Sequence, residues 1–154
     1  MSLHQGRFLF GVFLQRHRKT AKTKNITLSL EKTLTNTVVH ADQAKINEVI
    51  SNFIDNAIKY SPKETVITLS VQKTSSDMVE VLVEDEGVGV PKKEQPLLFT
   101  KFGRTSQAQA TRPEGLGLGL YLAKKTIDTH GGEIVFESEE GKGSSFGFRL
   151  RDKV

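Results

Sequence analysis

Hydrophobic and polar residues follow two periods along this chain, and the changes of period predict the order of its elements. Apolar residues recur with helical spacing in residues 7–24, from residue 43 to about Tyr60, and from about Gly117 to His130. Alternation with a period of two predicts strands in residues 26–31, 66–73, 79–84, 133–138 and 144–150. This order predicts an α/β (α+β) fold, a two-layer α/β sandwich with a mixed sheet of about five strands and helices on one face.

The second predicted helix has clear boundaries, and a long stretch without periodicity follows the central strands. Asp42 is a plausible N-cap. Ser61 and Pro62 end the helix, because the residue before a proline disfavours the helical region. Residues 86–116 are rich in Gly, Lys, Gln, Thr and Pro, and a loop of this length in a compact domain is usually functional or mobile.

The composition excludes several classes of protein. The chain has 154 residues, about one domain, and no cysteine, which excludes a disulfide scaffold, thiolate zinc sites and cysteine nucleophiles. No apolar run approaches the roughly 18 residues of a membrane span. The apolar run at residues 8–14 is followed by several basic residues and is interpreted as a helix face instead of an export signal.

The positive charge of the chain is concentrated at its start. The sequence pI near 9.3 first suggests a nucleic acid or an anionic surface as partner. Six of the 22 basic residues and no acidic residue lie in residues 1–25, which leaves 16 basic and 18 acidic residues in the rest. The globular part is therefore not basic, and we expect no nucleic-acid partner. The six basic residues are Arg7, Arg16, Arg18, Lys19, Lys22 and Lys24.

Two asparagines and a lysine fall on one stripe of the second helix. At 100° per residue, Asn56 and Lys59 lie within about 40° of Asn52, and apolar residues occupy the opposite arc. Asparagine is a poor residue inside a helix because its side chain competes for backbone hydrogen bonds. A carboxamide oxygen is a suitable Mg²⁺ ligand and a lysine suits phosphate oxygens. A solvated helix face accounts for the same stripe.

A carboxylate followed by two glycines ends the strand at residues 79–84. Asp85 could accept a hydrogen bond from an exocyclic amine such as that of adenine, and Gly87 and Gly89 permit positive φ and close approach of a ligand. An ordinary turn has the same composition.

Three alternating glycines precede the last helix. Gly115, Gly117 and Gly119, with Leu116, Leu118 and Leu120 between and after them, would expose backbone N–H groups that can bind phosphates. The run matches neither the P-loop nor the dinucleotide-binding fingerprint. A flexible hinge is the alternative reading.

Together these segments resemble the ATP-binding catalytic domain of bacterial sensor histidine kinases, over about residues 26–151. The wider superfamily includes gyrase, the heat-shock chaperone and the mismatch-repair ATPases. Five motifs occur in the order and spacing of the family. They are an asparagine box at residues 52–61, glycine boxes at residues 85–89, 115–120 and 141–146, and a phenylalanine box at residues 98–104.

The resemblance implies ATP and Mg²⁺ as cofactors and gives roles to residues at two ends of a site. Asn56 would bind Mg²⁺ and Asn52 would support the metal and phosphates. Lys59 would contact phosphate and Tyr60 would pack beside the nucleotide. At the other end, Asp85 would bond the adenine amine, with Gly87 and Gly89 beside it and help from Ser144, where the family usually has threonine.

The resemblance also implies that residues 91–113 form an ATP lid. Phe99 and Phe102 would anchor this lid, and Arg104 would steer phosphate or a docked partner domain. The glycines at 115, 117 and 119 would close over the phosphates, together with Leu116, Leu118 and Leu120. Leu116 stands where the family usually has threonine or serine, and Gly103 stands where an aromatic residue is often found.

The residue type at position 52 distinguishes a kinase from an ATPase within the family that the motifs resemble. Hydrolysing relatives carry a glutamate at this position, and a carboxamide cannot take a proton from an attacking water. We therefore expect transfer of the γ-phosphoryl group to a histidine on a separate dimerisation and phosphoacceptor domain. A catalytically silent ATP-binding sensor or regulatory module, and a serine kinase that acts on a regulator protein, are the alternatives.

The four histidines of the chain lack the family's phosphoacceptor motif. His130 is expected to have a capping or core role and His17 to lie on a solvated face; the other two are His4 and His40. Residues 1–25 are expected to be a connector helix from an absent upstream domain, and residues 26–154 the catalytic domain. The expected partners are that upstream domain and, indirectly, a response regulator. A cytoplasmic location follows, with no membrane contact by this segment and a parent protein that could be membrane-anchored.

Overall fold

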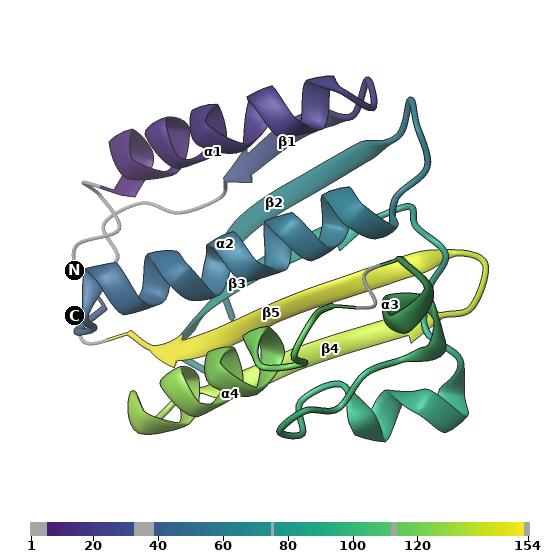
Figure 1. Ribbon diagram of the computed structural model, residues 1–154. Coiled ribbons are helices and arrows are strands. Elements are labelled where there is room, and N and C mark those ends of the chain that lie inside the picture. The colour runs from purple at the N-terminus through teal and green to yellow at the C-terminus, as the bar shows by residue number, and fades with distance from the viewer. Residues whose placement is uncertain (1–5, 33–38, 75, 112–113, 153–154) are drawn as a thin grey trace.

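The computed structural model describes residues 6–32, 39–74, 76–111 and 114–152, and its centre is one five-stranded sheet. The strand order is β1-β2-β3-β5-β4, and Figure 1 shows the long helices together on one face of the sheet. The predicted α/β sandwich is confirmed. The strands are β1 (Thr27–Lys32), β2 (Val66–Lys73), β3 (Met78–Asp85), β4 (Glu133–Glu139) and β5 (Gly143–Arg151). The helices are α1 (Gly6–Lys22), α2 (Gln43–Tyr60), α3 (Ser106–Thr111), α4 (Gly119–Thr129) and the 3-10 helix η1 (Lys92–Leu97).

The register of the sheet directs its apolar side chains towards the helices. β1 and β2 are parallel, and the other three pairs are antiparallel. Val81 pairs with Phe148 and Val83 with Phe146, so apolar residues on β3 and β5 share one face. All four are buried. Burial of such side chains, at about 25 cal/mol per Å² of apolar surface, is the main force that holds the helical layer on the sheet.

Helix α2 lies across the sheet and has the boundaries that its sequence predicts. The Asp42 carboxylate accepts a hydrogen bond from the Lys45 amide at 3.2 Å, which is the N-cap interaction. The helix ends at Ser61, whose extended backbone satisfies the restriction set by Pro62. Its apolar arc is buried: Ile46, Val49, Ile50, Phe53, Ile54, Ala57 and Ile58.

His130 connects the end of α4 to the start of α2. The Asp42 amide donates to His130 Nε2 at 3.1 Å, so this nitrogen is an acceptor. Nδ1 therefore carries the proton and donates to the Thr126 carbonyl at 2.7 Å. Both nitrogens of the ring are used for structure, which confirms the expected capping role.

Helix α1 packs on β1 and α2, so basic residues of the first segment belong to the packed domain. Leu14 and Ala21 are part of the same core as the sheet. The Lys24 ammonium donates to three carbonyls at the end of α2, those of Ile58, Lys59 and Ser61, at 2.9, 3.0 and 3.2 Å. A cation at the C-terminal end of a helix also interacts favourably with the helix dipole. That residues 1–25 continue from an upstream domain stays a prediction.

The prediction that His17 lies on a solvated face is wrong. His17 is 6% exposed; its Nε2 lies 3.0 Å from Ser51 Oγ and its Nδ1 lies 3.2 Å from Asp55 Oδ1. The charged residues around it in the sequence suggested a polar surface. Helical spacing instead puts His17 on the same face of α1 as Leu14 and Ala21, which is the face that meets α2.

Replacing His17 with alanine should destabilise the domain by about 1–3 kcal/mol, because Ser51 and Asp55 both lose a partner and a small cavity forms. Thermal unfolding should show a decrease in Tm of roughly 2–10 °C for a chain of this size. Arg18→Ala is the matched control, because Arg18 is an exposed residue of the same helix. An equal decrease in both variants would contradict the role assigned to His17.

None of the helices in the described ranges combines the length and the apolar character needed to cross a membrane.

Candidate functional site

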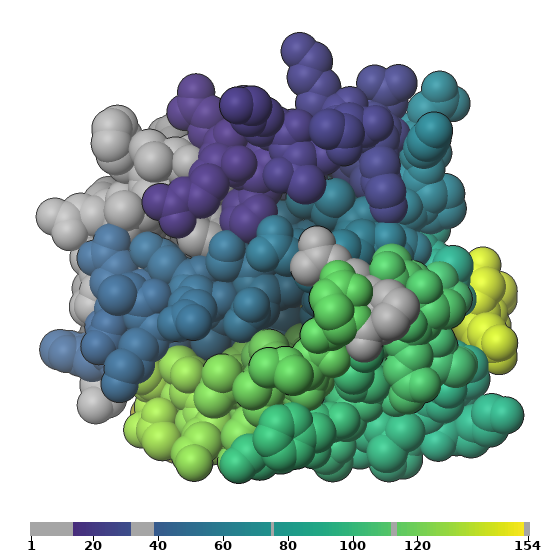
Figure 2. All heavy atoms as spheres, viewed as in Figure 1, coloured from purple at the N-terminus to yellow at the C-terminus, as the bar shows by residue number. Residues whose placement is uncertain are grey.

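A cavity of about 420 Å³ lies between α2, the loop after β3, the first residues of β5, and the segment from residue 98 to the start of α4. In the space-filling view, the blue surface of α2 borders the green surface of this segment and of α4 (Figure 2). Most residues predicted for the site line this one cavity: Asn52, Asn56, Lys59, Tyr60, Asp85, Gly89, Arg104, Gly115, Leu116, Gly117, Leu118, Gly119, Leu120 and Ser144.

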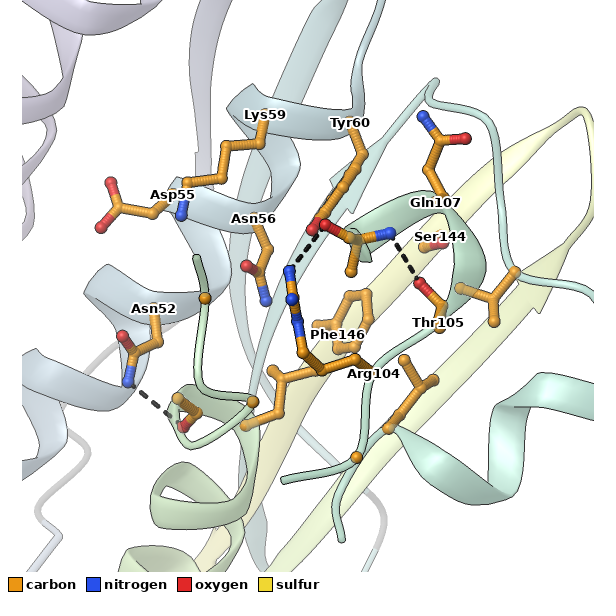
Figure 3. A pocket seen from close by; sticks show the side chains of 18 of the residues that line it. Asn52, Asp55, Asn56, Lys59, Tyr60, Arg104, Thr105, Gln107, Ser144 and Phe146 are labelled. Atoms are coloured by element: carbon orange, nitrogen blue, oxygen red, sulfur yellow. Dashed lines mark hydrogen bonds between the residues drawn. The ribbon is translucent and has the colours of Figure 1, made fainter. Parts of the chain in front are cut away.

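The polar stripe of α2 forms one wall. Figure 3 shows the carboxamide of Asn56 pointing into the cavity and Lys59 extending along the helix towards Asp55. Asn52 Nδ2 donates to the Gly119 carbonyl at 3.4 Å, which connects the stripe to the start of α4. No cluster of three or more His, Cys, Asp or Glu side chains suited to a metal occurs in the described part of the chain.

Asp85, the last residue of β3, lines the cavity from the sheet. Its Oδ1 accepts hydrogen bonds from the Gly87 amide at 2.8 Å and the Ser144 amide at 3.2 Å. The pairing of β3 with β5 puts Asp85 opposite Ser144 and so fixes this geometry. Burial raises the pKa of the Asp85 carboxyl, and the two amide hydrogen bonds partly oppose that rise.

Gly87 and Gly89 have different roles in the loop after β3. Gly87 donates to Asp85 and does not line the cavity; a Cβ there would lie 2.6 Å from the Tyr60 carbonyl oxygen. Gly89 lines the cavity with φ of +67°, and a Cβ there would lie 2.1 Å from the Glu139 carbonyl oxygen. Both positions require glycine because backbone lies against backbone.

The third wall is the glycine run before α4. Leu118 occupies the N-cap position and makes no capping hydrogen bond with its side chain. The N-cap residue therefore supplies no acceptor to the first N–H groups of α4, which suits an anion there. Gly117, at φ of +70°, approaches Gly103 so closely that a Cβ would lie 2.8 Å from the Gly103 oxygen.

The segment predicted as a lid has structure of its own. Glu94 in η1 accepts a hydrogen bond from the Ser106 amide at 3.0 Å, which links η1 to the start of α3. Arg104 Nη2 donates to the Ala108 carbonyl at 2.7 Å, and Thr105 Oγ1 accepts from the Ala108 amide at 3.1 Å; Figure 3 shows both bonds. Arg104 lines the cavity. Its contact with a phosphate or a partner stays a prediction.

One of the two predicted phenylalanine anchors is confirmed and the other is wrong. The Phe99 ring lies 6.0 Å from the Phe136 ring and 6.2 Å from the Phe146 ring, at the edge of the core. Phe102 is 61% exposed and does not line the cavity. Its backbone has φ of +62° and its amide donates to the Gly117 carbonyl at 3.1 Å, and this turn directs the side chain away from the core.

The structure adds cavity residues that were not singled out from the sequence. Asp55 follows Asn52 by three positions and lies on the flank of the same stripe, so the helical wheel could have identified it. Thr105, Gln107 and Ala108 come from α3 and its N-terminal side, a part of the long loop without a periodic signal. Only the fold brings these three residues to the cavity.

The fold is an open sheet with helices on one face. Its cavity lies between a polar helix stripe, a strand-end carboxylate and a glycine-rich helix start. This combination is typical of a class of nucleotide-binding α/β sandwiches. Residues 41–154 match the model of the histidine kinase-, DNA gyrase B- and HSP90-like ATPase family. The chain belongs to this family.

Two curated relatives are sensor kinases. Sensor histidine kinase WalK of Bacillus subtilis is 41% identical over 113 residues, which cover 73% of this chain and 18% of WalK. Adaptive-response sensory kinase SasA of Synechococcus sp. is 45% identical over 112 residues, which cover 73% of this chain and 29% of SasA. The chain thus spans less than a third of the length of these relatives. The resemblance to sensor histidine kinases that the motifs indicate is confirmed.

Solved structures show the same fold. The catalytic domain of histidine kinase ThkA, in a nucleotide-free form, superposes with a TM-score of 0.73 at 29% identity over 94% of this chain and 89% of that one. Full-length ShkA in complex with AMPPNP superposes with a TM-score of 0.82 at 22% identity, over 95% of this chain and 30% of that one. At the latter identity the likeness concerns the fold.

Proposed function

We propose that this chain binds Mg-ATP and transfers the γ-phosphoryl group to a histidine on a separate dimerisation and phosphoacceptor domain. The observation that carries the proposal is that one cavity is lined both by the carboxylate of Asp85 at the end of β3 and by the α2 stripe with its two carboxamides and an ammonium. Asp85 suits the amine of adenine. Asn52, Asn56 and Lys59 suit a triphosphate and its cation.

The donor set fits Mg²⁺ held jointly by protein and nucleotide. Mg²⁺ is often bound through one or two protein groups plus substrate phosphates. Asn56 would supply a carboxamide oxygen, with Asn52 beside it, and the bound cation would neutralise charge that develops on the phosphates. The chain itself orients the triphosphate through the Lys59 ammonium and the uncapped amides of α4.

Asn52 and its surroundings favour transfer over hydrolysis. A carboxamide cannot remove a proton from water, and Glu48, one turn earlier, does not line the cavity. In the transfer, a ring nitrogen of the acceptor histidine bonds to the γ-phosphorus, the bond from that phosphorus to the bridging oxygen breaks, and ADP leaves. The full kinase, its response regulator and its cytoplasmic location are part of this proposal.

A nucleotide-binding module without turnover is the second candidate, and Leu116 favours it. This side chain is 68% exposed and lacks the hydroxyl that the family usually has there.

Phosphotransfer to a supplied acceptor separates the two candidates. The chain, incubated with γ-labelled ATP, Mg²⁺ and a histidine-containing dimerisation domain from a sensor kinase, should label that domain with an acid-labile, alkali-stable phosphate. ATP binding without label would support the module without turnover, and acid-stable phosphoserine would show a serine kinase.

A further inference from the structure

The Ser138 hydroxyl, near the end of β4, lies just outside the cavity and has three polar neighbours. The Val90 amide donates to Ser138 Oγ at 2.8 Å. Ser138 Oγ lies 3.0 Å from the Gly143 carbonyl oxygen and 2.8 Å from Ser144 Oγ. Ser138 thus lies directly behind Ser144, a cavity residue that is 9% exposed.

The direction of each hydrogen bond follows from counting protons. A hydroxyl donates one hydrogen bond and accepts two. A carbonyl oxygen only accepts, so the proton of Ser138 goes to Gly143. The Val90 amide takes one lone pair of Ser138, and the remaining lone pair must accept the proton of the Ser144 hydroxyl.

The part of the cavity proposed to hold the adenine base therefore presents hydrogen-bond acceptors from both Ser144 and Asp85. With its proton committed to Ser138, Ser144 Oγ has only lone pairs to offer to the cavity. Asp85 lies beside it, held by the Ser144 amide through Oδ1, which leaves Oδ2 for a ligand. Two acceptors side by side favour a donor such as an exocyclic amine and repel a carbonyl oxygen.

We propose that Ser138 is a positioning residue for nucleotide specificity: it holds the Ser144 proton away from the cavity, and so makes the base end accept the amine of adenine and reject a purine with a carbonyl in that place. The inference rests on the proposed function, because it assumes that Asp85 and Ser144 face the base of ATP. It goes further by assigning the choice between bases to a residue that does not line the cavity.

Gln95 provides a control for a purely structural role of Ser138. Its Nε2 donates to the Val90 carbonyl at 3.0 Å and to the Ser138 carbonyl at 3.3 Å. Gln95 and Ser138 thus connect the same loop to the same strand. Gln95→Ala loosens this connection but leaves the proton of Ser144 in place, whereas Ser138→Ala releases the proton.

The test compares the equilibrium affinities for ATP and ITP in the wild type, Ser138→Ala, Ser138→Thr and Gln95→Ala. The base of ITP has a carbonyl where adenine has the amine. The preference of the wild type for ATP should fall by about three- to tenfold in Ser138→Ala, the effect of about one hydrogen bond. Ser138→Thr, which keeps the hydroxyl, should restore it. Gln95→Ala should change both affinities in parallel.

An unchanged ATP-to-ITP preference in folded Ser138→Ala would overturn the inference, as would an equal loss of preference in Gln95→Ala. Thermal unfolding shows whether each variant folds. If Ser138→Ala does not fold, Ser144→Ala takes its place: it removes the lone pairs that repel the carbonyl, so its preference should also fall, and an unchanged preference would overturn the inference. Failure of the wild type to bind ATP would overturn the proposed function and this inference together.

Discussion

Asp85→Asn should weaken ATP binding by roughly 100-fold or more while the fold stays intact. The amide donors of Gly87 and Ser144 hold Oδ1, so in the variant the carboxamide oxygen takes that place. The NH₂ group then replaces Oδ2 and faces the amine of adenine, donor against donor. The loss of a hydrogen bond to a charged group costs about 1.5–3 kcal/mol, and the opposed donors add to it.

The stability of Asp85→Asn should be equal to or higher than that of the wild type at neutral pH. Burial raises the pKa of Asp85 in the folded state, so between the ordinary pKa of an aspartate and this raised pKa the folded state binds more protons than the unfolded state. The contribution of this carboxyl to stability therefore falls as the pH rises through that window. An asparagine has no charge to bury and keeps both amide hydrogen bonds.

Calorimetric titration with ATP and thermal unfolding measure the two effects separately. As the pH is lowered, the ATP affinity of the wild type should begin to fall at a higher pH than the pKa of an ordinary aspartate would predict. Asp85→Asn should lack this part of the pH dependence of ATP affinity. Glu84→Gln is the control, because Glu84 is an exposed carboxylate next to Asp85. Wild-type affinity in Asp85→Asn would refute adenine recognition by this residue.

Asn56→Ala should remove the effect of Mg²⁺ on ATP binding and reduce phosphotransfer by about 100-fold or more, the usual cost of losing one group that stabilises transferring charge. The carboxamide points into the cavity from the polar stripe of α2, opposite the buried arc, so its truncation leaves the helix and that arc in place. Alanine is also the better helix former. The expected variant is thus stable but defective.

The measurement is ATP affinity with Mg²⁺ and with excess chelator. For the wild type, Mg²⁺ should strengthen binding; for Asn56→Ala, the two affinities should converge. Asn47→Ala is the matched control, since Asn47 lies on the same helix and does not line the cavity. A Mg²⁺ effect of wild-type size in Asn56→Ala would place the cation elsewhere.

Local sequence patterns predicted the three long helices, the five strands and most of the cavity, because each pattern has a local cause. The apolar arc of α2 is buried as its period requires, and the polar stripe opposite it lines the cavity. The end of β3 and the glycine run before α4 likewise follow from side-chain alternation and from the absence of Cβ atoms. These features do not depend on which other element packs nearby.

Patterns failed where the environment of a residue is set by a distant segment. His17 has charged neighbours in the sequence and yet is buried, because Ser51 and Asp55 on another helix provide its partners. Phe102 has a large apolar side chain, as core residues do, and yet it is exposed. The hydrogen bond from its amide to the Gly117 carbonyl holds the turn that contains it.

The sequence by itself determined the α/β class, the polar stripe and the family of this protein, since periodicity and motif order are properties of the chain. Only the tertiary structure decided that α1 packs on the domain, and that the lid segment contains η1 and α3. It alone placed Ser138 behind Ser144. The physical reason is that the direction of a hydroxyl proton depends on every group within hydrogen-bond distance, and here Val90 comes from the loop after β3 and Gly143 from the start of β5.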